Sequence, residues 1–202
     1  MGVFGGAFDP PHQAHVALAQ AAIEQLHLDE LRILPTGQAW HKPRGLSAPE
    51  HRLAMARLAF EALPAVRVDA RELQRSGPSY TADTLEELAR ELPGAELHLI
   101  MGADQWEVFK TWHRWQDISA MARLCVIARP GSPPPAAQPG LPAPTLLEMP
   151  SMDCSATAIR KALARGPLPE PMVPMLPPAV ARYISTHGLY GHPPPGLTAL
   201  HA

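Results

Sequence analysis

Short apolar runs alternate with longer segments of helical periodicity along the chain. The short runs are rich in Leu, Ile and Val and have the length of buried strands; they span residues 2–4, 31–34, 66–68, 97–101, 124–128 and 145–147. The longer segments place apolar residues three and four apart, as in amphipathic helices; they span residues 15–26, 49–63, 82–92, 104–109, 115–121, 156–165 and 179–186. Ser47 and Glu50 form a predicted capping box at the start of the second helix.

The alternation of strands and helices predicts right-handed βαβ units in an α/β fold. We therefore expect a Rossmann-like, doubly wound parallel sheet with helices on both faces. Residues 1–190 form the expected single domain, which includes a C-terminal helical part from about residue 152. Ligands of such sheets bind beyond the carboxyl ends of the strands, at the point where the strand order reverses.

Composition adds limits to this interpretation. The 46% of apolar residues is enough for a packed core, and the 25 prolines cluster in residues 129–144, 166–178 and 191–196. Proline supplies no ladder hydrogen bond, so we expect irregular connections in these stretches and a flexible tail over residues 191–202.

Charge and cysteine content exclude several classes of partner. A net charge of −2 gives no broad basic face for a nucleic-acid polymer, and the two cysteines, Cys125 and Cys154, form no secreted disulfide framework. The N-terminus lacks a signal-peptide pattern and no apolar run has membrane-spanning length. We expect a cytoplasmic protein without a membrane partner, and homo-oligomerisation is left open.

The stretch GGAFDPPHQAHV, residues 5–16, lies where the first strand turns into the first helix. Gly5 and Gly6 allow the backbone to approach a ligand closely, and the following helix start favours an anion. His12 and His15 flank this start, where both imidazoles can donate hydrogen bonds to phosphoryl oxygens. The combination predicts a phosphate-binding turn.

Two other interpretations of the histidines compete. A zinc pair on a helix normally has an i, i+4 spacing, and no third ligand of obvious spacing follows here, so we expect no metal site on the protein. Alternatively, the histidines are loop residues beside a structural turn. The glycine pair alone is weak evidence for a phosphate site, because it lacks the glycine spacing of dinucleotide-binding and P-loop motifs.

A second candidate anion site lies in MDCSATAIRKAL, residues 152–163. Ser155 and Thr157 stand at a predicted helix start, where a hydroxyl can simply cap the helix. Arg160, one turn later, adds a guanidinium that can bind phosphate through two hydrogen bonds. Two such helix starts can hold opposite ends of a triphosphate.

These two motifs carry a family resemblance. GGAFDPPHQAH resembles the G-x-F-D-P-x-H-x-G-H signature of the nucleotidyltransferase superfamily, and CSATAIR resembles its I-S-x-T-x-I-R partner. GPSYTADTL, MGADQWEVFKTWHRWQDI, CVIARPG and LPPAVARYISTHGLY extend the resemblance to bacterial nicotinate-nucleotide adenylyltransferases over nearly the whole chain. Ala14 replaces the usual glycine between the histidines, and Cys154 replaces the usual isoleucine.

The resemblance implies adenylyl transfer from ATP to nicotinate mononucleotide, which gives nicotinate adenine dinucleotide and pyrophosphate in NAD biosynthesis. Mg²⁺ is expected to arrive with ATP. A related enzyme with another acceptor, nicotinamide mononucleotide or phosphopantetheine, is the alternative, and a nucleotide-binding module without catalysis is a third. The implied catalytic residues are His12, His15 and Arg160.

The resemblance also distributes the binding residues. The ATP side is expected to use Gly5, Gly6, Phe8, His15, Gly102, Asp104, Arg129, Ser155, Thr157 and Arg160. The nicotinate-nucleotide side is expected to use Gly6, Ala7, Lys42, Thr81, Ala82, Trp112 and His113. Each has an ordinary alternative: Lys42 and Arg129 as surface cations, Asp104 as a helix N-cap, and Trp112 as a core residue.

The acceptor's carboxylate poses a separate question. No spare arginine stands beside PSYTADTL, residues 78–85, so a salt bridge is not expected there. We expect Thr81 to act as N-cap of the following helix, which leaves the backbone N–H groups near Ala82 to bind the carboxylate. Trp112 would stack on the pyridine ring, with the His113 N–H as a second donor.

Overall fold

A single sheet of parallel strands forms the centre of the molecule. The computed structural model describes residues 1–37, 45–127 and 135–191, and the sheet order within it is β3-β2-β1-β4-β5-β6. Every neighbouring pair is parallel. The strands are β1 (Gly2–Gly6), β2 (Leu31–Pro35), β3 (Val66–Val68), β4 (Leu97–Gly102), β5 (Ala122–Ile127) and β6 (Thr145–Leu147). The order reverses between β1 and β4, as in a doubly wound sheet.

Each strand sends alternate side chains into two separate cores. Phe4, Ile33 and Ile100 enter one cluster, whereas their neighbours Val3 and Leu34 enter the other. This alternation follows from the period of two along a strand. The apolar runs are nearly continuous because both faces of a parallel sheet are covered by helices.

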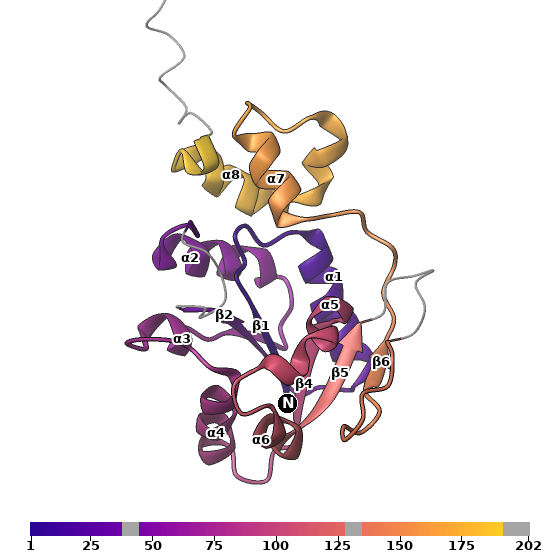
Figure 1. Ribbon diagram of the computed structural model, residues 1–202. Coiled ribbons are helices and arrows are strands. Elements are labelled where there is room, and N and C mark those ends of the chain that lie inside the picture. The colour runs from indigo at the N-terminus through magenta and orange to yellow at the C-terminus, as the bar shows by residue number, and fades with distance from the viewer. Residues whose placement is uncertain (38–44, 128–134, 192–202) are drawn as a thin grey trace, which may run out of the picture.

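Two groups of helices cover the two faces (Figure 1). The first cluster contains α1 (Gln13–Gln25) and α2 (Pro49–Phe60), which contribute Leu18, Met55 and Phe60. The second contains α4 (Thr81–Glu91), α5 (Ala103–Glu107) and α6 (Trp115–Met121), which contribute Leu85, Trp106 and Ile118. The short helices α3 (Arg71–Gln74) and η1 (Phe109–Thr111) complete the connections.

The C-terminal part packs on the first of these faces. α7 (Ala156–Leu163) and α8 (Pro178–Thr186) lie together above α1 and α2 in Figure 1, and Ile159, Leu163, Val180 and Ile184 join the first cluster. Between and after them lie η2 (Glu170–Met175) and η3 (Leu189–Gly191). α7 and α8 therefore share one core with the sheet.

The predicted fold class is confirmed, and each predicted strand and helix corresponds to an element of the structure. Two local predictions are wrong, and one short helix was missed. The α2 N-cap is Ala48 without a side-chain hydrogen bond; Ser47 instead directs its N–H to Asp9, so the capping box with Glu50 does not form. The proline stretch 166–178 contains the 3₁₀ helix η2, which has one proline at its first positions and Pro174 inside it. α3 was not predicted, because four residues show no periodicity. Among the described helices, none is long and apolar enough to cross a membrane.

Candidate active site

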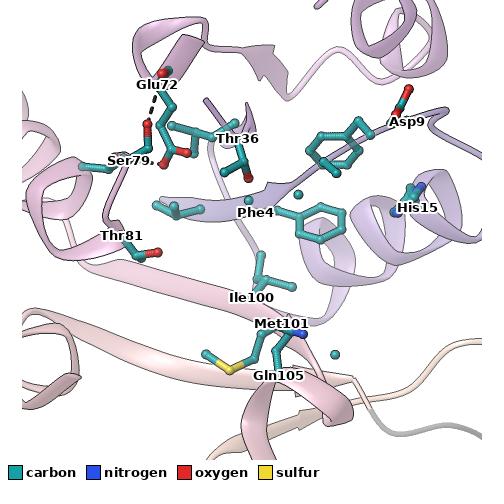
Figure 2. A pocket seen from close by; sticks show the side chains of 18 of the residues that line it. Phe4, Asp9, His15, Thr36, Glu72, Ser79, Thr81, Ile100, Met101 and Gln105 are labelled. Carbon is teal, nitrogen blue, oxygen red and sulfur yellow. Dashed lines mark hydrogen bonds between the residues drawn. The ribbon is translucent and has the colours of Figure 1, made fainter. Parts of the chain in front are cut away.

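A cavity of about 690 Å³ opens at the carboxyl ends of β1 and β4, where the strand order reverses. Its lining comes from β1 and the turn after it, from α1, the start of α4, the start of α5, the turn before α6, and α7. Figure 2 shows Glu72, Ser79 and Thr81 on one side of this space and His15 and Asp9 on the other. Segments far apart in the sequence therefore meet at the position where doubly wound sheets bind ligands.

The turn after β1 presents backbone to the cavity. Gly5 and Gly6 both line it, and a Cβ added to Gly5 would have only the Leu34 carbonyl oxygen, at 4.0 Å, near it. Gly6 is more confined, because its Cβ would lie 3.1 Å from the Phe8 ring. Phe8 has a φ of 47°, which is unusual for a side chain of this size. Phe8 lines the cavity, but its ring is 1% exposed and packs edge-on against Phe4 and Phe60, so most of its contacts are with the core.

His15 lies on the first turn of α1 and lines the cavity. Its Nδ1 accepts a hydrogen bond from the His12 backbone N–H at 3.1 Å, and its ring packs edge-on against Phe8. A Nδ1 that accepts is unprotonated, so the neutral ring carries its proton on Nε2. His15 is therefore held as a hydrogen-bond donor, the form that a phosphoryl oxygen requires.

His12 lies behind His15 and does not line the cavity. It is the N-cap residue of α1, 7% exposed, with its ring stacked on His15 at 3.7 Å between centroids. Burial lowers the pKa of His12 to about 4, so the ring is neutral at neutral pH. Its Nδ1 has no hydrogen-bond partner among the described residues. Of the two histidines, only His15 therefore lines the cavity. His12 stacks on the His15 ring from the buried side.

The start of α7 supplies the second candidate anion site. Thr157 and Arg160 line the cavity, and Arg160 Nη2 donates to Thr157 Oγ1 at 3.3 Å. Ser155 does not line it, because its hydroxyl caps the helix and accepts from the Ala158 N–H at 3.3 Å. Arg160 also donates to the Asp9 carbonyl oxygen at 2.6 Å. The Arg160 guanidinium is thus hydrogen-bonded to the turn after β1.

The start of α4 faces the cavity from the opposite side. Its N-cap is Tyr80, not Thr81 as expected; Thr81 is the first helical residue. Tyr80 makes no side-chain cap bond to any described residue, and the first N–H groups of a helix have no partner within the helix. Thr81 lines the cavity, whereas Ala82 is fully buried and presents only its backbone.

Two arginines do stand near this helix start, but both are occupied. Arg75 donates to Thr84 at 3.3 Å and to Glu87 at 2.8 Å. Arg114 pairs with three carboxylates of α4 and α6, namely Asp83, Glu86 and Asp117. Both guanidinium groups are therefore engaged by other side chains. The Arg114 pairs also tie the turn before α6 to the first turns of α4.

That turn contributes Trp112 and His113, which both line the cavity. Trp112 is half-buried and packs on Phe109 at 5.5 Å between ring centroids, so one part of it belongs to the core and another faces the cavity. The His113 ring packs on Tyr80 at 4.3 Å. The fully buried tryptophan of this region is Trp106 instead.

The end of β4 forms the floor of the cavity. Gly102 and Asp104 both line it, and a Cβ on Gly102 would lie 2.6 Å from Asp104 Oδ1. Asp104 is not the N-cap of α5, a position that Gly102 takes; its carboxylate accepts from Gln105 at 3.1 Å. Ala7 also lines the cavity. Lys42 and Arg129 lie outside the described residues.

Several cavity residues were missed by the sequence analysis. Glu72 lines the cavity next to α4, where its carboxylate accepts from Thr84 at 3.0 Å and its backbone oxygen accepts from Ser79 at 3.1 Å. Burial raises the pKa of Glu72. Gly37 packs against the same carbonyl, since a Cβ there would lie 2.0 Å from the Glu72 oxygen. A glutamate inside a short charged segment gave no signal that distinguished it from a surface residue.

The two departures from the family motifs lie next to one another. The Cys154 thiol approaches the backbone of Ala14 and Gln13 at the start of α1, and it donates to the Met175 carbonyl oxygen at 3.7 Å. Burial raises the pKa of this thiol. Ala14 and Cys154 therefore form one contact between α1 and the segment before α7.

Carboxylates are too dispersed here to enclose a metal ion. Over residues 1–37, 45–127 and 135–191, no group of three His, Cys, Asp or Glu side chains is arranged to hold one. The Glu72 carboxylate is occupied by Thr84. The donor set fits a magnesium ion held mainly by phosphates and water, which is its usual mode with nucleotides.

A glycine turn, a donor histidine and a second helix start thus surround one cavity at the switch point of a doubly wound sheet. The cytidylyltransferase-like family model matches residues 3–162. A probable nicotinate-nucleotide adenylyltransferase of Albidiferax ferrireducens is 51% identical, over 94% of this chain and 97% of its own length. One from Methylibium petroleiphilum is 42% identical, over 98% and 96%. The chain therefore belongs to the nicotinate-nucleotide adenylyltransferase family.

Solved structures agree on the fold. A Plasmodium falciparum nicotinic acid mononucleotide adenylyltransferase complexed with NaAD superposes with a TM-score of 0.75 at 19% identity, over 94% of this chain and 96% of that one. A putative nicotinate-nucleotide adenylyltransferase from Vibrio parahaemolyticus gives 0.66 at 20% identity, over 94% and 93%.

Proposed function

We propose that the cavity at the β1–β4 switch point transfers the adenylyl group of ATP to nicotinate mononucleotide, with release of pyrophosphate in the synthesis of a dinucleotide. The observation that carries this proposal is that one space is lined by His15, Arg160 and the start of α4. The first two are donors suited to a phosphate chain, and the third is suited to the acceptor's carboxylate.

The reaction forms a bond between a phosphate oxygen of the mononucleotide and the α-phosphorus of ATP, and it breaks the bond to the β-phosphate. The attacking oxygen is already anionic, so no residue has to remove a proton from it. Catalysis then consists of positioning and charge stabilisation. His15 donates from Nε2 to an α-phosphate oxygen as negative charge builds there, and Arg160 and Thr157 hold the departing pyrophosphate.

Mg²⁺ is proposed as the companion of ATP. When bound, it offsets the negative charge of the phosphates. Asp104 and Gly102 are proposed to bind the adenosine side, where a carboxylate accepts from ribose hydroxyls. Ser155 contributes by fixing the start of α7, and His12 by fixing His15. Since all substrates are metabolites, the proposed location is the cytoplasm.

Selectivity for the acid is proposed to come from the start of α4. A helix N-terminus stabilises an anion by about 0.3–1 kcal/mol, and by up to about 2 kcal/mol when partly buried. Hydrogen bonds from N–H groups to a charged acceptor add about 1.5–3 kcal/mol. Nicotinamide has an NH₂ group in place of one carboxylate oxygen, so it loses one such bond and brings two donors together. We expect at least a ~100-fold preference for the acid in kcat/KM.

A panel of acceptors tests the proposal. The protein is incubated with ATP, Mg²⁺ and either nicotinate mononucleotide, nicotinamide mononucleotide or phosphopantetheine, and pyrophosphate is measured. Release with nicotinate mononucleotide at least ~100-fold faster than with the others is expected. Equal use of the two pyridine nucleotides would overturn the α4 account, and preference for phosphopantetheine would overturn the acceptor assignment.

A further inference from the structure

A buried polar cluster lies at the turn after β1, on the wall of the cavity. Its centre is Asp9, which is 1% exposed. The Asp9 carboxylate accepts from the Ser47 N–H at 3.0 Å and from the Tyr190 hydroxyl. Tyr190 belongs to η3 and stands 181 residues away in the sequence. The proposed mechanism does not use this pair.

The same turn is held through its backbone by two arginines. Arg52, 2% exposed on α2, donates to the Ala7 carbonyl oxygen at 3.0 Å and to the Ser47 carbonyl oxygen at 3.1 Å. Arg160 donates to the Asp9 carbonyl oxygen at 2.6 Å. Asp9 therefore contacts both residues: its carbonyl oxygen accepts from Arg160, the proposed pyrophosphate-binding residue, and its carboxylate accepts from the Tyr190 hydroxyl.

The geometry points to Tyr190 as a positioning residue for ATP: through Asp9 it fixes the turn after β1 and the Arg160 guanidinium relative to each other. This inference rests on the proposed function, since it concerns the phosphate end of that cavity. The Tyr190 hydroxyl and the Asp9 carboxylate form a charge-assisted hydrogen bond, which is stronger than a neutral one. Without the hydroxyl, one oxygen of a buried carboxylate loses its partner and the Asp9 side chain reorients.

The effect is expected on one substrate only. Arg160 and the turn after β1 belong to the phosphate side, whereas the acceptor's pyridine end lies at α4, across the cavity. Tyr190→Phe removes a single oxygen atom, and the Arg160 guanidinium is then expected to lose one charge-assisted hydrogen bond to the phosphates of ATP. The Kd of ATP should therefore rise roughly tenfold. The KM for nicotinate mononucleotide should change less than about twofold.

Tyr183 offers a matched control. It lies on α8, and its hydroxyl bonds to His51 Nδ1 at 3.0 Å, so it also joins the C-terminal part to α2. Its ring and hydroxyl contacts within the described residues are with His51 and His187, away from the turn after β1. Tyr183→Phe therefore removes the same atom from the same part of the molecule, and we expect it to leave the affinity for ATP unchanged.

The experiment measures the Kd of ATP with Mg²⁺, without acceptor, by titration calorimetry, together with the KM of both substrates and the melting temperature. Tyr190→Phe should raise the ATP Kd and KM roughly tenfold, and the same change in an Arg160→Ala background should add less than about twofold. Equal effects of Tyr190→Phe and Tyr183→Phe, an equal rise in both KM values, or full additivity with Arg160→Ala would overturn the inference.

Two further measurements cover the cases in which Tyr190→Phe does not fold or the acceptor assignment is wrong. If Tyr190→Phe does not fold, Asp9→Asn tests the same link, and an unchanged Kd for ATP in that variant would refute it. Because the ATP titration contains no acceptor, it remains valid if the acceptor assignment is wrong. A wild-type protein that binds ATP but produces no dinucleotide would contradict only the proposed function.

Discussion

At the scale of single residues, burial gives His12 and His15 different roles although they are the same residue type on one helix start. His15 lines the cavity with a fixed Nε2 donor, whereas His12 is stacked behind it at 3.7 Å and kept neutral by burial. The sequence spacing indicated that both belong to one site. The spacing did not indicate that His12 would support His15, because that arrangement depends on which of the two rings is buried in the folded protein.

The donor role of His15 predicts a large loss of rate on its removal. His15→Ala should lower kcat about 10²–10³-fold, as expected when one group that stabilises transition-state charge is removed. Steady-state release of pyrophosphate measures this loss, and circular dichroism checks the fold. His51→Ala is the matched control, since His51 bonds to Tyr183 away from the cavity. Turnover within threefold of wild type in folded His15→Ala would exclude the role.

The buried state of His12 predicts a specific dependence of stability on pH. The unfolded chain protonates this ring near pH 6.5, whereas the folded protein resists protonation down to about pH 4. The unfolded state therefore binds more protons in this window, and stability falls as the pH drops from about 6.5 to about 4. Integrated over the window, the loss is on the order of 3 kcal/mol.

His12→Asn isolates this effect, because asparagine is a good N-cap and does not titrate. Urea unfolding from pH 7 to pH 4 should show that the free energy of unfolding falls more steeply in wild type than in His12→Asn. Parallel curves for the two proteins would show that His12 is not the group responsible.

At the scale of elements, strands were easier to predict than the ends of helices. Each predicted strand is present, because an apolar run of strand length has few other solutions in an α/β sequence. Two predicted caps are wrong: Thr81 follows the N-cap Tyr80, and the Ser47 N–H donates to Asp9 while Ala48 is the N-cap of α2. Hydroxyl residues near a helix start fit several positions equally well, and tertiary contacts then decide between them.

Two elements meet at the proposed acceptor end, α4 and the turn that carries Trp112. Trp112→Ala should raise the KM for nicotinate mononucleotide roughly tenfold with little change for ATP, because it removes the surface proposed to stack on the pyridine ring. Trp115→Ala is the control, since Trp115 packs nearby but does not line the cavity. Equal rises in both KM values for Trp112→Ala would indicate a general disturbance of the core instead.

At the scale of the whole molecule, the site exists only because three parts of the chain converge. The turn after β1, the start of α4 and the start of α7 lie far apart in sequence and share one cavity. The sequence indicated the first and third through the two superfamily motifs, and the second through the helix start in PSYTADTL. It did not indicate Asp9 or Tyr190 as partners, because a buried contact across 181 residues has no local pattern.

This convergence predicts how ligands stabilise the fold. ATP, as proposed, bridges the sheet and α7, so it binds only the folded protein. At a concentration about 100 times its Kd it should add about 2.7 kcal/mol of stability, which for a chain of this size raises the melting temperature by roughly 5–10 °C. Arg160→Ala loses the bridge at α7, and at the same ATP concentration its shift should fall to about half or less.

Nicotinate mononucleotide separates this account from a general loss of binding. Its proposed carboxylate site lies at α4, so its thermal shift should be the same in wild type and in Arg160→Ala. Arg165→Ala, an exposed residue just after α7, should retain the full ATP shift. A variant Arg160→Ala that keeps the whole ATP shift, or that loses the shifts of both substrates together, would place ATP elsewhere, because a cation at the phosphate end is expected to contact ATP and not the pyridine end of the mononucleotide.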